Sequence, residues 1–313
     1  MRRWFGTALV ALCVVGIVWW DGPQHLMVVG FDAPIGKAPS PVESTCAQPC
    51  DAPPLGVRSF NVLCSFCAKE GYDDWETRLP HLRAAIFRHS PDLIGLQELV
   101  GEADVASIFG LDSPYTMVSW SVAGKVYADS ALFYRTARFV EQDSGQIWLS
   151  RSPMLPLSRS WTLSFPRVIQ WVLLEDRLSG ATVLFANTHL DNNGENKIPS
   201  AALFGQAIPP MAGHVPVIVT GDFNTRVDDA RFDTIRGTLV DVFSQVDQPE
   251  FSGQQEGVAH TRRAVFPDQR IDHILVSEGV EVLRAEHSAP VFGEPPGRPS
   301  DHPTIYAEVV LDR

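Results

Sequence analysis

The sequence predicts an α/β domain in which two packed β-sheets are flanked by helices. Three observations lead to this class. From Val57 onward the chain consists mostly of short apolar runs separated by turns, which is typical of strands. Only a few segments between these runs have helical periodicity. The 313 residues, of which 45% are hydrophobic and 20% charged, are ordinary for a chain that forms a core and suggest one large domain or two small ones.

The first 20 residues predict a signal peptide or an N-terminal membrane anchor. Arg2 and Arg3 precede 17 residues, from Trp4 to Trp20, in which Thr7 is the only clearly polar side chain. This length lies between the apolar core of a signal peptide, about 7–15 residues, and a spanning helix, about 17–25 residues. Tryptophans at both ends and the lack of a small-residue cleavage site favour the uncleaved anchor. The two arginines predict that the rest of the chain lies outside the cytoplasm.

Residues 21–56 predict an extended linker, because prolines recur throughout the segment. They are Pro23, Pro34, Pro39, Pro41, Pro49, Pro53 and Pro54. The rest of the chain, residues 57–313, is then a single predicted domain.

Within this domain, apolar runs predict strands in the following order: VRSFNVL, DLIGLQE (residues 92–98), ALFYR, GQIWLS, VIQWVLLED, ATVLFANTHL, PVIVTGDFN, RIDHILVS, VEVLRAEH and PTIYAEVVLD. The turn DRLSGA (176–181) joins two of them as a hairpin. A helix is predicted over Arg78–His89, where Leu79, Leu82, Ala85 and Ile86 share one face. A second helix is predicted over Glu195–Ile208.

Polar side chains recur where these apolar strands end. They are Asn61, Gln97-Glu98, residues 187–191 (NTHLD), residues 221–224 (GDFN), Asp272-His273 and Ser300-Asp301-His302. Strand ends on a rigid sheet are places where scattered segments build a site. Carboxylate and amide oxygens suit Mg²⁺, Mn²⁺ or Ca²⁺, and histidines transfer protons near neutral pH. Together these segments predict a metal-assisted catalytic site.

Net charge and cysteines restrict the function further. The formal net charge of −12 disfavours a tight, nonspecific nucleic-acid binder. Four cysteines, Cys46, Cys50, Cys64 and Cys67, follow the N-terminal segment. In an exported domain they favour two disulfides, and a four-thiolate zinc site is the alternative. The sequence does not choose among the three possible pairings.

Several of these stretches resemble the endonuclease/exonuclease/phosphatase superfamily, which includes pancreatic-type DNases, AP endonucleases, bacterial sphingomyelinases, inositol polyphosphate 5-phosphatases and deadenylases. The matching stretches are SFNVL, DLIGLQE, ALFYR, NTHLD, VTGDFN, RIDHILVS and SDHP, in family order over residues 57–303. The W-x-x-R segment Trp75–Arg78 and the strand Gly145–Ser150 resemble a bacterial subgroup. The resemblance implies a four-layer α/β/β/α sandwich with two mostly antiparallel sheets. It also implies metal-dependent hydrolysis of a phosphoester, most simply a phosphodiester.

The resemblance assigns metal and substrate contacts to particular residues. Asn61 and Glu98 would hold the divalent cation, Mg²⁺ or else Mn²⁺ or Ca²⁺, and Asp301 would help to bind it or orient its neighbours. Tyr134 matches the family's phosphate-contacting tyrosine through a short motif. Arg167 is a candidate substrate contact.

The resemblance also assigns the catalytic groups. His302 would activate the attacking water, and Asp272 would orient its imidazole. His189 would contact the scissile phosphate and stabilise its developing negative charge. Asp222 and Asn224 would position the water and the phosphate, or share a second metal. Such an arrangement matches the needs of in-line attack on a phosphodiester, in which charge develops on the phosphate oxygens.

The implied substrate is a nucleic acid, a nucleotide or a phospholipid headgroup. The acidic balance weakens the case for a processive nuclease, and the predicted membrane-proximal location favours a lipid or an extracellular nucleotide. The segment 1–20 would contact the membrane if it is not cleaved, and no protein partner is indicated. A noncatalytic binding module on the same fold is the alternative, since fold does not imply function.

Overall fold

A computed structural model of the chain describes residues 53–311 except 68, 119–120, 123–124, 127, 160, 163, 253–269 and 290–296. The predicted N-terminal segment 1–20 and nearly all of the predicted linker lie outside the described residues. The first strand begins at Leu55, two residues before the predicted start of the domain. In the described part of the chain, no helix is both long enough and apolar enough to cross a membrane.

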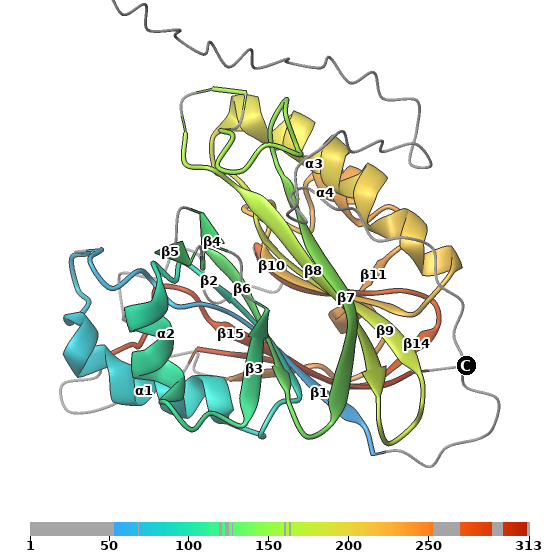
Figure 1. The fold of residues 1–313 in the computed structure, drawn as a ribbon, viewed down its shortest axis with the longest axis horizontal. Coiled ribbons are helices and arrows are strands. Elements are labelled where there is room, and N and C mark those ends of the chain that lie inside the picture. Colours follow the sequence, from blue (N-terminus) through green and yellow to red (C-terminus); the bar gives the residue numbers. More distant parts are fainter. Residues whose placement is uncertain are drawn as a thin grey trace, which may run out of the picture. The chain divides into compact units, whose positions relative to one another are not determined.

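Two mixed sheets of seven and six strands form the centre of the domain (Figure 1). The seven-stranded sheet has the order β12 (Glu250–Ser252), β14 (Val280–Ser288), β15 (Thr304–Leu311), β1 (Leu55–Asn61), β2 (Leu93–Gln97), β6 (Ser130–Arg135) and β3 (Tyr115–Val118). The six-stranded sheet has the order β11 (Val240–Asp241), β13 (Asp272–Val276), β10 (Val217–Asp222), β9 (Thr182–His189), β8 (Val168–Asp176) and β7 (Phe139–Trp148). A separate pair consists of β4 (Ser121–Val122) and β5 (Lys125–Val126).

Most neighbouring strands in both sheets are antiparallel, as predicted. The parallel pairs are β1 with β2, β12 with β14, and β9 with β10. A continuous apolar core fills the space between the two sheets. It combines Val57 and Leu132 of the seven-stranded sheet with Phe185 and Ile218 of the six-stranded sheet. The two sheets therefore pack face to face.

Helices cover the outer face of each sheet (Figure 1). On the seven-stranded sheet lie α1 (Trp75–Phe87) and α2 (Glu102–Phe109). On the six-stranded sheet lie α3 (Gly194–Ala207), α4 (Ala230–Arg236) and the 3₁₀ helix η1 (Pro209–Gly213). A second 3₁₀ helix, η2 (Val242–Ser244), follows β11. The four-layer α/β/β/α sandwich is thus confirmed.

The predicted helices are present with slightly shifted ends. The first begins at Trp75 rather than Arg78, because the Asp74 carboxylate accepts a hydrogen bond of 2.9 Å from the Thr77 amide and caps the helix there. The second runs over Gly194–Ala207, one residue earlier at each end than the predicted Glu195–Ile208.

A buried amide connects the two sheets beneath their polar end. Asn187, on β9, donates through Nδ2 to the carbonyls of Leu96 and Ala131, each at 2.9 Å. Its Oδ1 accepts from Gln97 Nε2 at 2.7 Å and from Thr220 Oγ1 at 3.0 Å. All four hydrogen-bonding positions of this amide are used, as a buried polar side chain requires. A Cβ at Gly95 would lie 1.9 Å from Thr220 Oγ1, which explains a glycine within the β2 run.

Replacing Asn187 with alanine is expected to lower the free energy of unfolding by about 2–4 kcal/mol, because buried partners on both sheets lose their hydrogen bonds. Urea unfolding of the two proteins measures the difference. The matched control is Gln142→Ala, since this amide pairs with Glu175 at the exposed surface and its loss should cost less than about 0.5 kcal/mol. Equal stability of the two variants would contradict the role of Asn187.

Candidate active site

The strand register of the six-stranded sheet brings three predicted residues together. His189 at the end of β9 lies beside Asp222 at the end of the parallel strand β10. Asp222 in turn lies opposite Asp272 at the start of the antiparallel strand β13. Neighbouring strands are about 4.7–4.9 Å apart, so these three side chains form a row across one end of the sheet. All three are buried.

The seven-stranded sheet contributes Asn61 and Glu98 at the same end. Asn61, the last residue of β1, pairs in register with Gln97, and Glu98 follows directly. Asn61 Nδ2 donates to Glu98 Oε1 at 2.9 Å and to Asp222 Oδ2 at 3.2 Å. Glu98 has a φ of 67°, in the left-handed region that residues with a Cβ rarely adopt. The Asn61 amide therefore joins the two halves of the site, one from each sheet.

His302 and Asp272 form a buried pair. His302 Nδ1 lies 2.8 Å from Asp272 Oδ2, and its Nε2 lies 3.8 Å from Asp222 Oδ2. The loop that carries His302 is held against β1, because Ser300 Oγ donates to the Asn61 carbonyl at 2.7 Å. Burial by itself would lower the pKa of His302, but the carboxylates of Asp272 and Asp222 outweigh it and raise that pKa to about 10. These carboxylates thus stabilise a proton on His302.

A second histidine–carboxylate pair lies on the other side of Asp222. His189 Nε2 is 3.4 Å from Asp222 Oδ2, and His189 Nδ1 is 3.2 Å from Asp129 Oδ1. The other oxygen of Asp129 accepts from Arg167 Nη1 at 3.0 Å. Burial favours the neutral form of Asp129, yet Arg167 and His189 outweigh it and hold its pKa well below the usual range. Arg167 therefore belongs to the site through Asp129.

Asp129 is a site residue that the sequence analysis did not find. It directly precedes β6, which is antiparallel to β2, so the start of β6 meets the end of β2. A search restricted to residues that follow strands misses it. The available signal was a carboxylate two residues before the strand ALFYR. The antiparallel pairing of that strand with DLIGLQE places Asp129 beside Glu98.

Tyr134 does not lie at the site, contrary to the implied phosphate contact. It pairs with Leu93 at the start of β2, whereas the site lies at the end of that strand, where Gln97 pairs with Ser130. Four residues along a strand correspond to about 13 Å. The Tyr134 hydroxyl donates instead to Glu141 Oε2 at 3.1 Å. The short ALFYR motif does not specify the direction of the strand relative to β2. Tyr134 therefore lies at the end of β6 that is remote from the site.

Asn224 fixes the loop that follows β10. Its backbone amide donates to Asp222 Oδ1 at 2.8 Å, and its side-chain Nδ2 donates to the Leu190 carbonyl at 2.9 Å. Its φ of 46° is again in the left-handed region, which asparagine tolerates better than most residues. Asn224 thereby orients the Asp222 carboxylate, and its direct contact with a phosphate stays a prediction.

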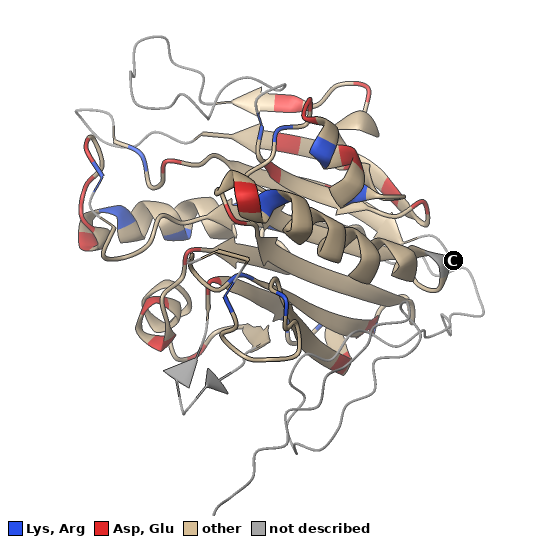
Figure 2. Ribbon diagram, turned by 90° about the horizontal axis from the view of Figure 1, so that it is seen from above, with Lys and Arg blue, Asp and Glu red and all other residues tan. Residues whose placement is uncertain are grey.

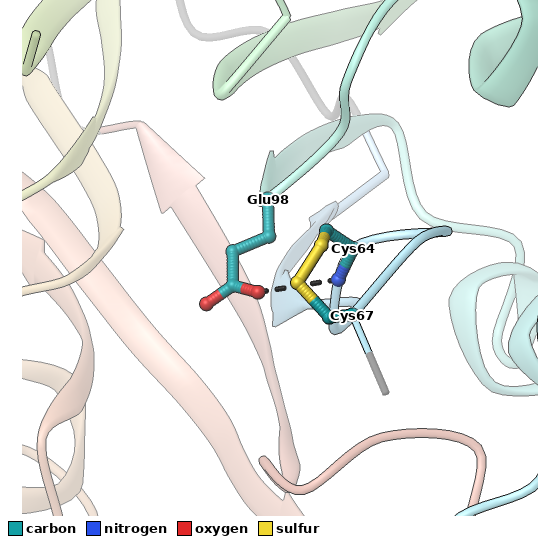
Figure 3. Close-up of side chains that lie close together, drawn as sticks. All are labelled: Cys64, Cys67 and Glu98. Atoms are coloured by element: carbon teal, nitrogen blue, oxygen red, sulfur yellow. Dashed lines mark hydrogen bonds between the residues drawn. A yellow bond between two sulfur atoms is a disulfide. The ribbon is translucent and has the colours of Figure 1, made fainter. Parts of the chain in front are cut away.

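Cys64 and Cys67 form a disulfide with each other, in the loop after Asn61. The Cys64 amide donates to Glu98 Oε2 at 3.2 Å, so the disulfide loop contacts this carboxylate directly (Figure 3). The two sulfurs are therefore not available for a four-thiolate zinc site. Cys46 and Cys50 lie outside the described residues.

Arg78, the arginine of the W-x-x-R segment, holds this loop in place. Its Nη1 donates to the carbonyls of Val62 at 3.0 Å and Pro299 at 2.6 Å, and its Nη2 donates to the Leu63 carbonyl at 2.9 Å. The buried guanidinium thus connects the loop after β1 to the loop that carries His302.

The donor set fits a hard divalent cation. Glu98 is only partly buried, and Asp301 Oδ1 is a buried oxygen without a hydrogen-bond partner among the described residues. The other oxygen of Asp301 pairs with Lys69. Carboxylate oxygens of this kind are the usual ligands of Mg²⁺, Mn²⁺ and Ca²⁺. The Asn61 amide presents its nitrogen to Glu98, so its oxygen would face a cation there only after the amide turned over.

A second candidate position lies deeper in the site. Ligand atoms of Asp222, Asp272 and His302 all lie within 4.8 Å of one another. This group overlaps the residues predicted for catalysis rather than those predicted to hold the metal. The site therefore offers carboxylates at two neighbouring positions.

Two packed sheets with helices outside, and carboxylates and two histidines at one end of both, suit metal-assisted hydrolysis of a phosphoester. Residues 59–302 match the model of the Endonuclease/Exonuclease/phosphatase family. The chain belongs to this family, and it is a phosphoester hydrolase.

The chain is similar to the uncharacterised protein YbhP of Escherichia coli K12, with 26% identity over 263 residues that cover 81% of this chain and 97% of YbhP. A solved structure of a family member from Bacteroides thetaiotaomicron is similar at a TM-score of 0.71 and 26% identity, covering 83% of this chain and 98% of that one. A mannosyl-6-phosphatase from Bacteroides thetaiotaomicron VPI-5482 is similar at a TM-score of 0.70 and 26% identity, covering 82% of this chain and all of that one.

Proposed function

We propose that the protein is an exported enzyme of the bacterial subgroup that hydrolyses a phosphodiester with a divalent cation and a histidine-activated water. The observation that carries this proposal is the convergence of two histidine–carboxylate pairs on one carboxylate. His302 and His189 approach Asp222 Oδ2 to 3.8 and 3.4 Å, one from the loop before β15 and one from β9. Two proton-handling groups on separate elements suit a reaction that takes a proton from water and stabilises charge on a phosphate.

His302 acts as the base in this mechanism. Asp272, hydrogen-bonded to Nδ1, fixes the orientation of the imidazole and leaves Nε2 directed toward Asp222. Because the pKa of His302 is about 10, its Nε2 accepts the proton of the attacking water only in molecules whose imidazole is neutral, so the rate is expected to rise as the pH approaches that value. Asp222 orients the water. The resulting imidazolium is stabilised by the two carboxylates that raise the pKa of His302.

His189 acts on the phosphate. Asp129 holds its Nδ1, which leaves Nε2 to donate to a phosphate oxygen as negative charge develops there. Glu98, with Asp301 and Asn61, would hold the divalent cation, preferably Mg²⁺. When bound, this cation supplies positive charge that offsets the charge of the phosphate oxygens.

Charge and chain organisation bear on the substrate. The net charge of −12 opposes nonspecific nucleic-acid binding, and Figure 2 shows Lys and Arg positions interspersed with Asp and Glu along the described ribbon. The predicted N-terminal anchor favours a second candidate function, hydrolysis of a phospholipid headgroup outside the cytoplasm. The similar mannosyl-6-phosphatase acts, by its name, on a phosphomonoester. A phosphomonoester is therefore included among the substrates to be tested.

The test is a substrate panel with the full-length protein. Bis(p-nitrophenyl) phosphate, p-nitrophenyl phosphate, single-stranded DNA, sphingomyelin vesicles and phosphoinositide vesicles are each assayed with Mg²⁺ and with excess EDTA. We expect Mg²⁺-dependent hydrolysis of diesters that EDTA abolishes. Rates that are the same with and without the chelator would disprove the proposal, and turnover of monoesters alone would move the substrate class to phosphatases. Export is tested by fusing residues 1–56 to a reporter enzyme that is active only outside the cytoplasm.

A further inference from the structure

The loop that joins β7 to β8, residues 149–167, exposes several large apolar side chains. The structure describes this loop except for residues 160 and 163. Leu155 is 59% exposed and Phe165 is 75% exposed, and Leu157 is exposed as well. Single exposed apolar side chains are normal on a protein surface, whereas a group of them in one loop indicates a surface that contacts something.

This β7–β8 loop lies at the end of the sheets that carries the candidate active site. The Leu149 amide donates to the Arg167 carbonyl at 2.8 Å and closes the loop. Arg167 in turn pairs with Asp129, which holds His189. Of the nine large apolar side chains that are exposed in the described part of the chain, six lie at this end. Besides those of the loop they are Phe66 after β1, Val100 after β2 and Ile198 near the start of α3.

Hydrogen bonds within the loop hold its leucines in this exposed arrangement. Ser158 Oγ donates to the Ser152 carbonyl at 2.9 Å and lies 2.6 Å from Ser150 Oγ. The Leu155 amide donates to the Ser152 carbonyl at 2.9 Å, and the Leu155 carbonyl accepts from the Ser158 amide at 3.1 Å. Leu157 has a φ of 56°, in the left-handed region, which a leucine adopts only where its surroundings fix it. The exposed leucines are thus presented by a backbone with defined contacts.

The β7–β8 loop is also basic, although the chain as a whole is acidic. No aspartate or glutamate occurs in residues 144–174, whereas the formal net charge of the chain is −12. Arg151 and Arg159 are exposed and lie on either side of the two leucines in the sequence. Apolar side chains flanked by arginines are typical of segments that lie in the interface of an anionic bilayer. Because the rest of the chain is net negative, an anionic surface favours the orientation in which this loop faces it.

The part of the chain outside the described residues supports a bilayer as the occupant. Residues 1–20 are the predicted signal peptide or membrane anchor, and 34 residues separate them from Leu55 at the start of β1. A chain of that length spans at most about 110 Å. The seven residues of β1 cover only about 23 Å between Leu55 and the site end of the sheet. An anchored chain is therefore long enough for the site end of the domain to face the same bilayer.

We propose that the β7–β8 loop docks the domain onto the surface of an anionic lipid bilayer. Leu155, Leu157 and Phe165 enter the boundary between headgroups and acyl chains. Arg151 and Arg159 pair with the headgroup phosphates. The docking surface goes beyond the proposed function, because contact with lipid does not require hydrolysis. It also places the active site at the headgroups, so that a phosphoester reaches the site while its lipid stays in the bilayer.

Lipid contact is tested with the full-length protein in vesicles that contain a photoactivatable phosphatidylcholine, with and without phosphatidylserine. Mass spectrometry compares the label on the β7–β8 loop with the label on the β8–β9 hairpin, which exposes Arg177 and Leu178 at the opposite end of the sheet. With phosphatidylserine we expect about tenfold more label on the loop than on the hairpin. A label on the loop that does not exceed that on the hairpin overturns the proposal.

Two variants with matched controls assign the contact to particular side chains. Phe165→Ser is expected to lower the label on the loop by about tenfold, whereas Leu178→Ser leaves it unchanged. Arg159→Gln is expected to lower it by about fivefold only in vesicles with phosphatidylserine, and Arg177→Gln is its control. A label that either loop variant leaves at the wild-type level overturns the proposal. A dimer that dissociates in Phe165→Ser, measured by light scattering, would assign the surface to a second copy of the chain and also overturn it.

Turnover separates this inference from the proposed function. Phe165→Ser should hydrolyse the soluble diester bis(p-nitrophenyl) phosphate within about twofold of the wild-type rate, and a phosphoinositide in vesicles at least about tenfold more slowly. An equal loss on both substrates overturns the docking role. If the wild type hydrolyses neither substrate, the proposed function fails, and the lipid label still decides on the docking surface. The label decides in the same way if only the soluble diester is hydrolysed.

Discussion

Replacing His302 with alanine is expected to lower kcat on a phosphodiester by about 10³-fold, because the variant lacks the group that takes the proton from water. The measurement is steady-state turnover of bis(p-nitrophenyl) phosphate at saturating Mg²⁺. The control is His214→Ala, which removes an exposed histidine at the end of η1 and should leave kcat within about twofold. A His302→Ala rate within tenfold of wild type would show that another group acts as the base.

The role of His302 can also be tested through its pKa. Asp272 is the largest cause that raises the pKa of His302, so Asp272→Asn is expected to lower that pKa from about 10. Titration of the imidazole nitrogens by NMR in metal-free protein measures it. The neutral form of His302 is then reached at lower pH, because the variant stabilises the imidazolium less. An unchanged His302 pKa in Asp272→Asn would contradict the pairing seen in the structure.

Replacing Glu98 with glutamine is expected to weaken divalent-cation binding by about 10²-fold or more, because it removes a ligand charge without changing the shape of the side chain. Calorimetric titration with Mn²⁺ measures affinity independently of turnover. In the assay, the Mg²⁺ concentration for half-maximal rate should rise by a similar factor.

The control for this change is Glu102→Gln, which removes an exposed carboxylate in the first turn of α2. Its Mn²⁺ affinity should equal that of the wild type. If Glu98→Gln also binds Mn²⁺ as the wild type does, the cation lies at the deeper position, among Asp222, Asp272 and His302. Asp222→Asn would then be the variant that loses affinity.

Most of the longer strands, and the end of the sheets that bears the polar residues, were predictable because both follow from local pattern. The short strands β3, β4, β5, β11 and β12 and the helices α2 and α4 were not predicted. Apolar runs define the strands. In the seven-stranded sheet the ends of β1 and β2 lie side by side, and in the six-stranded sheet the ends of β9 and β10 meet the start of β13. His189, Asp222 and Asp272 thus lie side by side without any long-range information beyond strand pairing.

Residues outside that pattern were missed or misplaced for identifiable reasons. Asp129 precedes its strand, and Tyr134 lies on the correct strand but at the wrong end, because a motif does not state direction. The Cys64–Cys67 pairing depends on the path of a loop, which periodicity does not determine.

Because the Cys64 amide contacts Glu98, the redox state of the Cys64–Cys67 disulfide is expected to affect the cation site. In a preparation kept in dithiothreitol, Cys64 and Cys67 are free thiols, whereas in an oxidised preparation they are joined by the disulfide. The backbone amide that contacts Glu98 is then less constrained in the reduced protein than in the oxidised protein. Batches with the same sequence and the same purity would then differ in the cation concentration they need. Thiol content is therefore a quantity to report with every activity measured on this protein.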